Sequence, residues 1–221
     1  MNTEEKQTAE EQKSTKERIL DAGERLFALQ GYGNTSLRAL TAEAGVNLAA
    51  VNYHFGSKEA LLRAIFERRL NPMNRIRIER MEEVARQAEE AGRAPRPGDV
   101  LEAFISPVFR NRESGNGMKD FSTLVGRTLA EPDPSGRDLF TGYMRPVLSR
   151  CLELLCAGLP TLSKEVVFWR LMLIVGAMGH IMRLPKDFPL LPEGVAVPED
   201  AEGFLSLLMP FVTAGMEAPN R

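Results

Sequence analysis

The chain has 221 residues, of which 43% are apolar and 26% are charged, as in an ordinary soluble globular protein. This length accommodates one large domain or two small ones. Two cysteines and two histidines are too few for a disulfide scaffold and argue against a zinc site, and a net charge of −2 does not by itself indicate a nucleic-acid partner.

The charges are unevenly distributed along the chain. Residues 13–70 carry nine Lys and Arg against six Asp and Glu, whereas residues 71–221 carry eighteen against twenty. A mildly basic N-terminal part followed by a near-neutral remainder fits a protein that binds DNA through its N-terminal part, although a chance distribution of charges is the simpler alternative.

The sequence shows no targeting or membrane signal. The N-terminal stretch is polar and acidic, without the apolar segment of a signal peptide, and the longest apolar run, Leu171–Gly179, is too short to span a bilayer. Cys151 and Cys156 lie five residues apart on a predicted helix and therefore point to different faces. We expect a reduced, cytoplasmic protein with no membrane partner, metal or cofactor.

The first predicted helix follows a disordered tail at residues 1–13. Ser14 and Glu17 have the spacing of a capping box, which marks the start of this helix. Gly31 and Gly33 end it. Apolar residues recur at helical spacing on one stripe, at Ile19, Ala22, Gly23, Leu26 and Phe27.

Two short helices are predicted next, at residues 35–44 and 48–55. Gly45 separates them, Asn47 is a good N-cap for the second, and Gly56 ends it. The second helix combines small residues with polar and aromatic ones, which suits a groove better than a core. Two short helices joined by a tight turn containing Gly form the helix-turn-helix pattern.

The remaining elements are also predicted to be helices, and no segment has the pattern of a strand. A long helix begins after Ser57 and runs to about Gly92, with a kink or break expected near Leu70 and Asn71 because of Pro72. A loop follows at residues 92–98, and Asp99 is expected to cap the next helix. The later helices are placed at about residues 99–112, 118–130, 135–157, 164–183 and 199–216.

Residues 14–70 resemble the DNA-binding domain of the TetR family of bacterial transcriptional regulators. The resemblance rests on an ordered series of motifs over about a quarter of the chain. They are Arg18-Ile19-Leu20-Asp21-Ala22, Leu26-Phe27, Gly31-Tyr32, Thr35-Ser36-Leu37-Arg38, Ala44-Gly45-Val46 and Asn52-Tyr53-His54-Phe55-Gly56-Ser57-Lys58-Glu59-Ala60-Leu61.

The resemblance implies an all-α protein that is not an enzyme. Its parts would be a three-helix helix-turn-helix domain at residues 14–57, a connecting helix at 58–92, and a helical ligand-binding and dimerisation domain at 93–221. Because one module buries only roughly 600–1,000 Å² on DNA, we expect a homodimer that reads a palindromic operator.

Candidate DNA contacts come from residue chemistry and from the resemblance. Hydroxyls and free N–H groups at a helix start suit a phosphate, and Asn can pair with adenine. The resemblance places Tyr53 and His54 against the sugar-phosphate backbone and Arg38 within reach of a base. The candidate set is Thr35, Ser36, Arg38, Asn47, Leu48, Ala49, Ala50, Asn52, Tyr53, His54 and Lys58.

Each candidate also has a purely structural explanation. Thr35 and Ser36 would serve as helix caps in any protein, and Tyr53 and His54 could be the edge of a core. Lys58 could be a solvated charge. The sequence does not determine which bases are read.

The C-terminal half is predicted to form the dimer and to hold an effector. Residues 167–182 are apolar on more than one face, as are residues 204–212, so the two helices could meet their copies in a partner or form a monomer's core. Members of the family enclose a small-molecule pocket among the middle helices, although such side chains are more often plain core. The candidate lining is Phe104, Phe121, Leu124, Tyr143, Met144, Trp169, Met172 and His180.

Three stretches, two of them outside the DNA-binding domain, are similar to a fatty-acid-responsive branch of the family, which would imply a fatty acid or acyl-CoA as the effector. They are residues 45–58, 168–170 and 209–216. The alternative is a repressor of a drug-efflux operon that senses aromatic or cationic compounds. A different class, a helical carrier or interaction protein that does not bind DNA, would leave residues 14–70 as scaffold.

Overall fold

Every regular element of the computed structural model is an α-helix within the residues that it describes, 14–112, 118–131, 134–184 and 188–220. This confirms the all-α prediction. The chain forms two compact units. Of the described residues, the first contains 14–69 and those of the segment 123–140, and the second contains those of 70–122 and 141–220.

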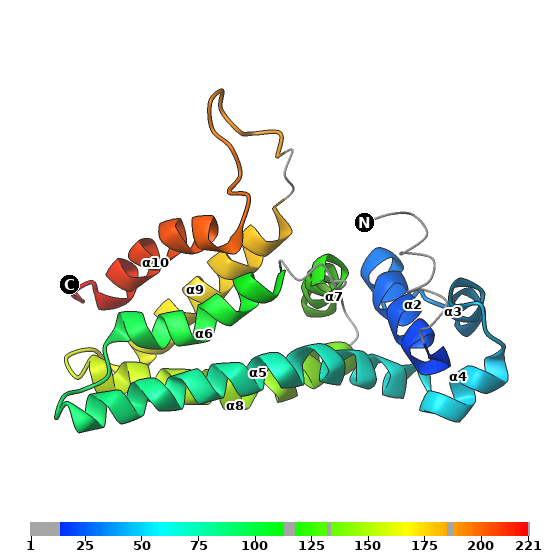
Figure 1. Cartoon of the computed structure of the whole chain (residues 1–221), viewed down its shortest axis with the longest axis horizontal. Coiled ribbons are helices and arrows are strands. Elements are labelled where there is room, and N and C mark those ends of the chain that lie inside the picture. Colours follow the sequence, from blue (N-terminus) through cyan, green and yellow to red (C-terminus); the bar gives the residue numbers. More distant parts are fainter. Residues whose placement is uncertain (1–13, 113–117, 132–133, 185–187, 221) are drawn as a thin grey trace. The chain divides into compact units, whose positions relative to one another are not determined.

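The first unit is built on three short helices and the start of a long one. Helix α2 (Thr15–Gln30) begins at the capping box that the sequence predicts, with the Glu17 amide donating to Ser14 Oγ over 3.2 Å. Helices α3 (Leu37–Ala44), α4 (Leu48–Phe55) and α5 (Lys58–Glu90) follow (Figure 1). Their shared core contains Ile19, Phe27, Leu40, Val51, Leu61, Leu62, Ile65 and Phe66.

A segment from far along the sequence completes the first unit. It comprises the end of α7 (Met118–Ala130) and the start of α8 (Pro134–Gly158). Arg127 Nη2 donates to the Leu29 carbonyl over 2.9 Å, and the rings of Phe66 and Phe140 lie 6.1 Å apart. The predicted boundaries at residues 57 and 92 do not anticipate this return of the chain.

The second unit packs the rest of α5 and α8 with α6 (Pro97–Arg112), α9 (Lys164–Arg183) and α10 (Ala201–Glu217). Helix α10 lies along α6 (Figure 1), and Arg110 pairs with Glu202 over 2.8 Å. Arg150 on α8 pairs with Glu82 on α5 over 2.7 Å. The buried faces of α6 and α8 supply much of the core, including Leu101, Phe104, Ile105, Phe109, Val147 and Leu155.

Three local predictions are wrong. Helix α3 starts at Leu37 and not at Thr35, because Ser36 is its N-cap. A break of α5 at Pro72 is wrong, because the helix is continuous through the proline, with Leu70 and Met73 buried beside it; a kink there stays a prediction. Asp99 lies in the first turn of α6, because Pro97 is the first helical residue, a position that tolerates its missing N–H.

Candidate nucleic-acid interface

Helix α4 is held to the first unit by one fully buried side chain, Val51. Asn47 caps the helix by accepting a hydrogen bond from the Ala50 amide over 2.9 Å, as predicted. The apolar Leu48 side chain is half exposed at 49%, and the Tyr53 side chain is 86% exposed. A short helix that leaves such groups in solvent is typical of a surface that meets a partner.

The turn between α3 and α4 is fixed from α2 by Arg18. Its Nε and Nη2 donate to the Ala44 carbonyl over 3.1 and 2.7 Å, and Nη2 also donates to the Gly45 carbonyl over 2.7 Å. Gly45 has a left-handed backbone with φ of +62°. These bonds satisfy carbonyls at the helix end and set the direction in which α4 leaves the turn.

Lys58 and Thr35 are engaged inside the first unit. The Lys58 ammonium donates to the Tyr32 carbonyl over 2.8 Å and to the Thr35 carbonyl over 3.1 Å, and it lies 4.4 Å from the centre of the Tyr32 ring. Thr35 is 2% exposed, and its hydroxyl donates to the Gly31 carbonyl over 2.8 Å. A phosphate contact by the Thr35 hydroxyl is therefore wrong for this conformation.

The other candidate DNA contacts lie at the surface of α3 and α4. Ser36 is exposed and accepts from the Ala39 amide as the α3 cap. The Tyr53 and His54 rings form an edge-to-face pair with centres 5.1 Å apart. The exposed candidates are Ser36, Arg38, Asn47, Leu48, Ala49, Asn52 and Tyr53, and Ala50 and His54 are half-buried.

The sequence reasoning missed two features that position α4. Arg18 was counted only as part of a family motif, since nothing in its spacing indicates a bond to residues 44 and 45. The second is an ion-pair cluster around Glu24, which is 2% exposed and pairs with Arg68 and Arg69 over 2.7 and 2.8 Å. It joins α2 to α5 and so braces the helix that supports α4.

The structure places the candidate effector-pocket residues in different settings. Phe104, Phe121 and Met144 are buried within the second unit, but Leu124 belongs to the first unit. Trp169 is 59% exposed and His180 is exposed, because α9 turns these side chains away from the core of the chain, so placing them in its interior is wrong. Tyr143 and Met172 are half-buried.

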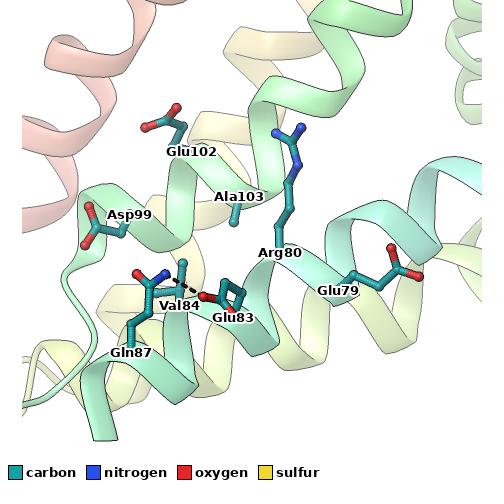
Figure 2. A pocket seen from close by; sticks show the side chains of 8 residues that line it. All are labelled: Glu79, Arg80, Glu83, Val84, Gln87, Asp99, Glu102 and Ala103. Atoms are coloured by element: carbon teal, nitrogen blue, oxygen red, sulfur yellow. Dashed lines mark hydrogen bonds between the residues drawn. The ribbon is translucent and has the colours of Figure 1, made fainter. Parts of the chain in front are cut away.

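The structure shows a hollow of about 390 Å³ between α5 and α6 in the second unit. Figure 2 shows carboxylates on both of its walls, with Arg80 extending from α5 toward α6. Its lining is Glu79, Arg80, Glu83, Val84, Gln87, Asp99, Glu102 and Ala103. Within the described residues no group of three His, Cys, Asp or Glu is placed to hold a metal ion.

Comparison with known proteins identifies the family. Residues 19–65 match the bacterial regulatory proteins of the tetR family, and residues 102–215 match the C-terminal domain described as tetracyclin repressor-like, which is more than half of the chain. The chain belongs to the TetR family. It is therefore a DNA-binding transcriptional regulator with a helix-turn-helix domain, and not an enzyme.

The curated relatives match mainly over the N-terminal part. The uncharacterized HTH-type regulator TtgW of Pseudomonas putida is 37% identical over 68 residues, 31% of this chain and 51% of that protein. YerO of Bacillus subtilis, also an uncharacterized HTH-type regulator, is 34% identical over 110 residues, 50% of this chain and 34% of that protein. The matches thus span from about a third to about half of these relatives.

Solved structures share the fold over nearly the whole chain. The fatty acid degradation regulator FadR from Bacillus halodurans gives a TM-score of 0.62 at 15% identity, covering 93% of this chain and 97% of that one. The TetR family regulator PfmR from Thermus thermophilus gives 0.59 at 19% identity, covering 92% and 100%. At these identities the likeness establishes the TetR-like fold.

Proposed function

We propose that this TetR-family regulator is a repressor that binds palindromic operator DNA as a homodimer and is released by a small hydrophobic effector. The exposed surface of α4 carries the DNA-binding part of the proposal. That surface combines an amide, an aromatic ring and small apolar groups on a helix whose direction is fixed from α2. These groups are suited to base edges, thymine methyls and the sugar-phosphate backbone.

The dimer part of the proposal is supported by an exposed apolar face on α9 and α10. Trp169 and Leu173 are 59% and 73% exposed one turn apart on α9, and Leu207 and Phe211 are 68% and 72% exposed one turn apart on α10. Such a face is unusual on a soluble monomer and suits the same two helices of a second copy.

Helix α9 is also the kind of long apolar helix that could span a membrane. Its segment Lys164–Met182 is long and apolar enough to cross a bilayer by length and composition, and 22% of this stretch is buried within the chain. Helices that pack against other helices in soluble proteins pass the same test. A partner's α9 and α10 would cover this apolar surface, which is the arrangement we propose.

The effector part of the proposal takes the second unit as the sensor. Its core contains aromatic and Met side chains of α6 and α8, including Phe104, Phe109 and Met144, a composition suited to an apolar molecule. Effector binding would favour an arrangement of the dimer in which the distance between its two α4 helices no longer matches the spacing of the operator half-sites. A shift from mostly bound to mostly released needs about 5.5 kcal/mol of differential affinity.

The deciding experiment is fluorescence anisotropy of the full chain on its own upstream intergenic DNA, over a salt series and with or without oleoyl-CoA. Tight, salt-sensitive binding that the acyl-CoA releases supports all parts of the proposal. Binding that is indifferent to oleoyl-CoA retains the regulator and discards this effector. If no specific complex forms with this DNA, the proposed operator is wrong.

Variants of two exposed residues test the interface. Arg38→Ala and Tyr53→Ala remove side chains that lie outside the core. The fold should therefore be unchanged while affinity falls roughly 5- to 150-fold, the range for losing 1–3 kcal/mol of contact energy. Arg75→Ala is the matched control, because Arg75 is 74% exposed on the second-unit part of α5. Retention of wild-type affinity in Arg38→Ala and Tyr53→Ala would contradict the interface.

A further inference from the structure

The second unit contains a buried guanidinium, that of Arg77 on α5. Arg77 is 2% exposed. Its Nε donates to the Phe104 carbonyl over 2.9 Å, and its Nη1 donates to Asn74 Oδ1 over 3.3 Å and lies 3.8 Å from Met144 Sδ. The guanidinium carbon lies 4.5 Å from the centre of the Phe104 ring. All of these partners are neutral.

Arg77 differs in this respect from the arginines that form ion pairs between helices. Arg68 and Arg69 pair with Glu24, and Arg150 pairs with Glu82. The hydrogen bonds of Arg77 go to neutral groups, and among the described residues none of its partners is a carboxylate. Burial lowers the pKa of Arg77 to about 10, so the side chain is still protonated at neutral pH. A buried charge without a counter-charge is costly and rare in proteins.

A second guanidinium lies one turn further along the same helix. Arg80 extends from α5 toward α6 (Figure 2), where its Nη1 donates to Ser106 Oγ over 2.8 Å. Ser106 is fully buried, so this bond brings a second positive group to the same helix pair. Arg80 lines the hollow together with the carboxylates of Glu79, Glu83, Asp99 and Glu102, whereas Arg77 is buried in a unit whose α6 and α8 contribute the apolar core residues Ile105, Val108 and Val147.

We propose that Arg77 anchors the acidic group of the effector, so that the effector is an amphipathic anion with a carboxylate or another oxyanion on an apolar body. The proposal rests on the proposed function, because it takes the second unit as the effector-binding part. A guanidinium offers two parallel N–H donors that match an oxyanion, and the apolar core of the second unit suits the body of a ligand that enters when the packing opens.

The burial of Arg77 links binding to a change of conformation. Because the side chain is 2% exposed and packs on the Phe104 ring, an anion reaches it only when the packing of α5 against α6 opens. An anion therefore binds the opened arrangement better than the closed one. Preferential binding of this kind is what an effector needs in order to shift the population of a regulator.

The test compares acids with uncharged molecules of the same shape on the full chain, by isothermal titration calorimetry without DNA. The probes are oleate with oleyl alcohol, decanoate with decanol, and 1-naphthoate with 1-naphthylmethanol. At least one acid should bind the wild type roughly 10- to 100-fold more tightly than its alcohol, because a hydrogen bond to a buried charge is worth about 1.5–3 kcal/mol. Dodecyl phosphate then separates a carboxylate from a phosphate as the preferred group.

Arg77→Met should abolish the preference for the acid and retain the affinity for the alcohol. Arg75→Met is the matched control, because it makes the same change at an exposed position of the same helix and should retain the preference. If no acid outbinds its alcohol on the wild type, the proposal is overturned even if Arg77→Met does not fold. A preference that persists in folded Arg77→Met also overturns it. Anisotropy on DNA, measured separately, reports whether the regulator function stands.

Discussion

Gly45, in the turn before α4, is constrained both by its backbone conformation and by the neighbouring Arg18 side chain. Its φ of +62° is strained for any residue with a side chain, and a Cβ there would lie 2.8 Å from Arg18 Nη2. We expect Gly45→Ala to destabilise the protein by about 1–2 kcal/mol, the usual cost of a left-handed conformation, and to weaken operator binding, because Arg18 must shift from the carbonyls that it holds. Thermal unfolding and DNA anisotropy measure the two effects.

Gly33→Ala is the control for Gly45→Ala. Gly33 precedes the same helix pair, has no positive φ and has nothing within 4 Å of an added Cβ. It should leave stability and operator affinity nearly unchanged. Equal effects of the two substitutions would show that the turn geometry at Gly45 is not what positions α4.

The sequence did not reveal which helix-start residues bond within the protein and which stay available for DNA. The sequence places Thr35 and Lys58 at helix starts, and both positions fit a phosphate contact equally well. The structure shows the Thr35 hydroxyl and the Lys58 ammonium bonded to carbonyls of the α2–α3 connection. One of these carbonyls, that of Tyr32, lies 26 positions from Lys58. A local sequence pattern therefore cannot show that this carbonyl accepts a hydrogen bond from the Lys58 side chain.

At the scale of elements, the ion-pair cluster around Glu24 fixes α2 on α5. The Glu24 carboxylate is almost fully buried and receives two guanidiniums whose side chains are 25% and 15% exposed. Glu24→Gln keeps the shape but removes the charge, which leaves the Arg69 guanidinium without its carboxylate, whereas Arg68 keeps its pair with Asp21 over 2.7 Å. Breaking a buried pair in this way costs about 3–5 kcal/mol. Urea unfolding of the full chain should show the loss in the transition of the first unit.

Glu43→Gln is the matched control for this prediction. Glu43 pairs with Arg25 over 3.0 Å between α2 and α3, but the two side chains are 34% and 60% exposed. A surface pair of this kind contributes about 0–1 kcal/mol. If Glu24→Gln were no more destabilising than Glu43→Gln, the cluster would not be the brace that we describe.

Helix boundaries were predictable where a local signal decides them. The caps Ser14 and Asn47 and the end at Gly56 are local features, and all three are found as expected. Pro72 was misleading because tertiary packing of its buried neighbours outweighs a missing hydrogen bond. The return of residues 123–140 to the first unit depends on contacts such as Arg127 with Leu29, which no periodicity records.

At the scale of the whole molecule, the apolar face on α9 and α10 carries the last prediction. Arg170 on α9 donates to the Met216 and Ala218 carbonyls over 2.8 and 2.6 Å, so the end of α10 is held on α9. We expect Leu173→Asp to convert a wild-type dimer to a monomer, because burying an unpaired carboxylate there costs several kcal/mol, and about 3 kcal/mol already raises the dimer Kd roughly 100-fold.

Light scattering after size exclusion measures this change, and Leu190→Asp is the control. Leu190 is 79% exposed in the connection between α9 and α10, so Leu190→Asp makes the same substitution at an exposed Leu outside the apolar face. The Leu173→Asp monomer should also bind operator DNA much more weakly, because each module alone reads only one half-site. If Leu173→Asp stays dimeric, the proposed interface on α9 and α10 is wrong. If it is a monomer that binds the operator with full affinity, the proposal that binding requires two modules is wrong.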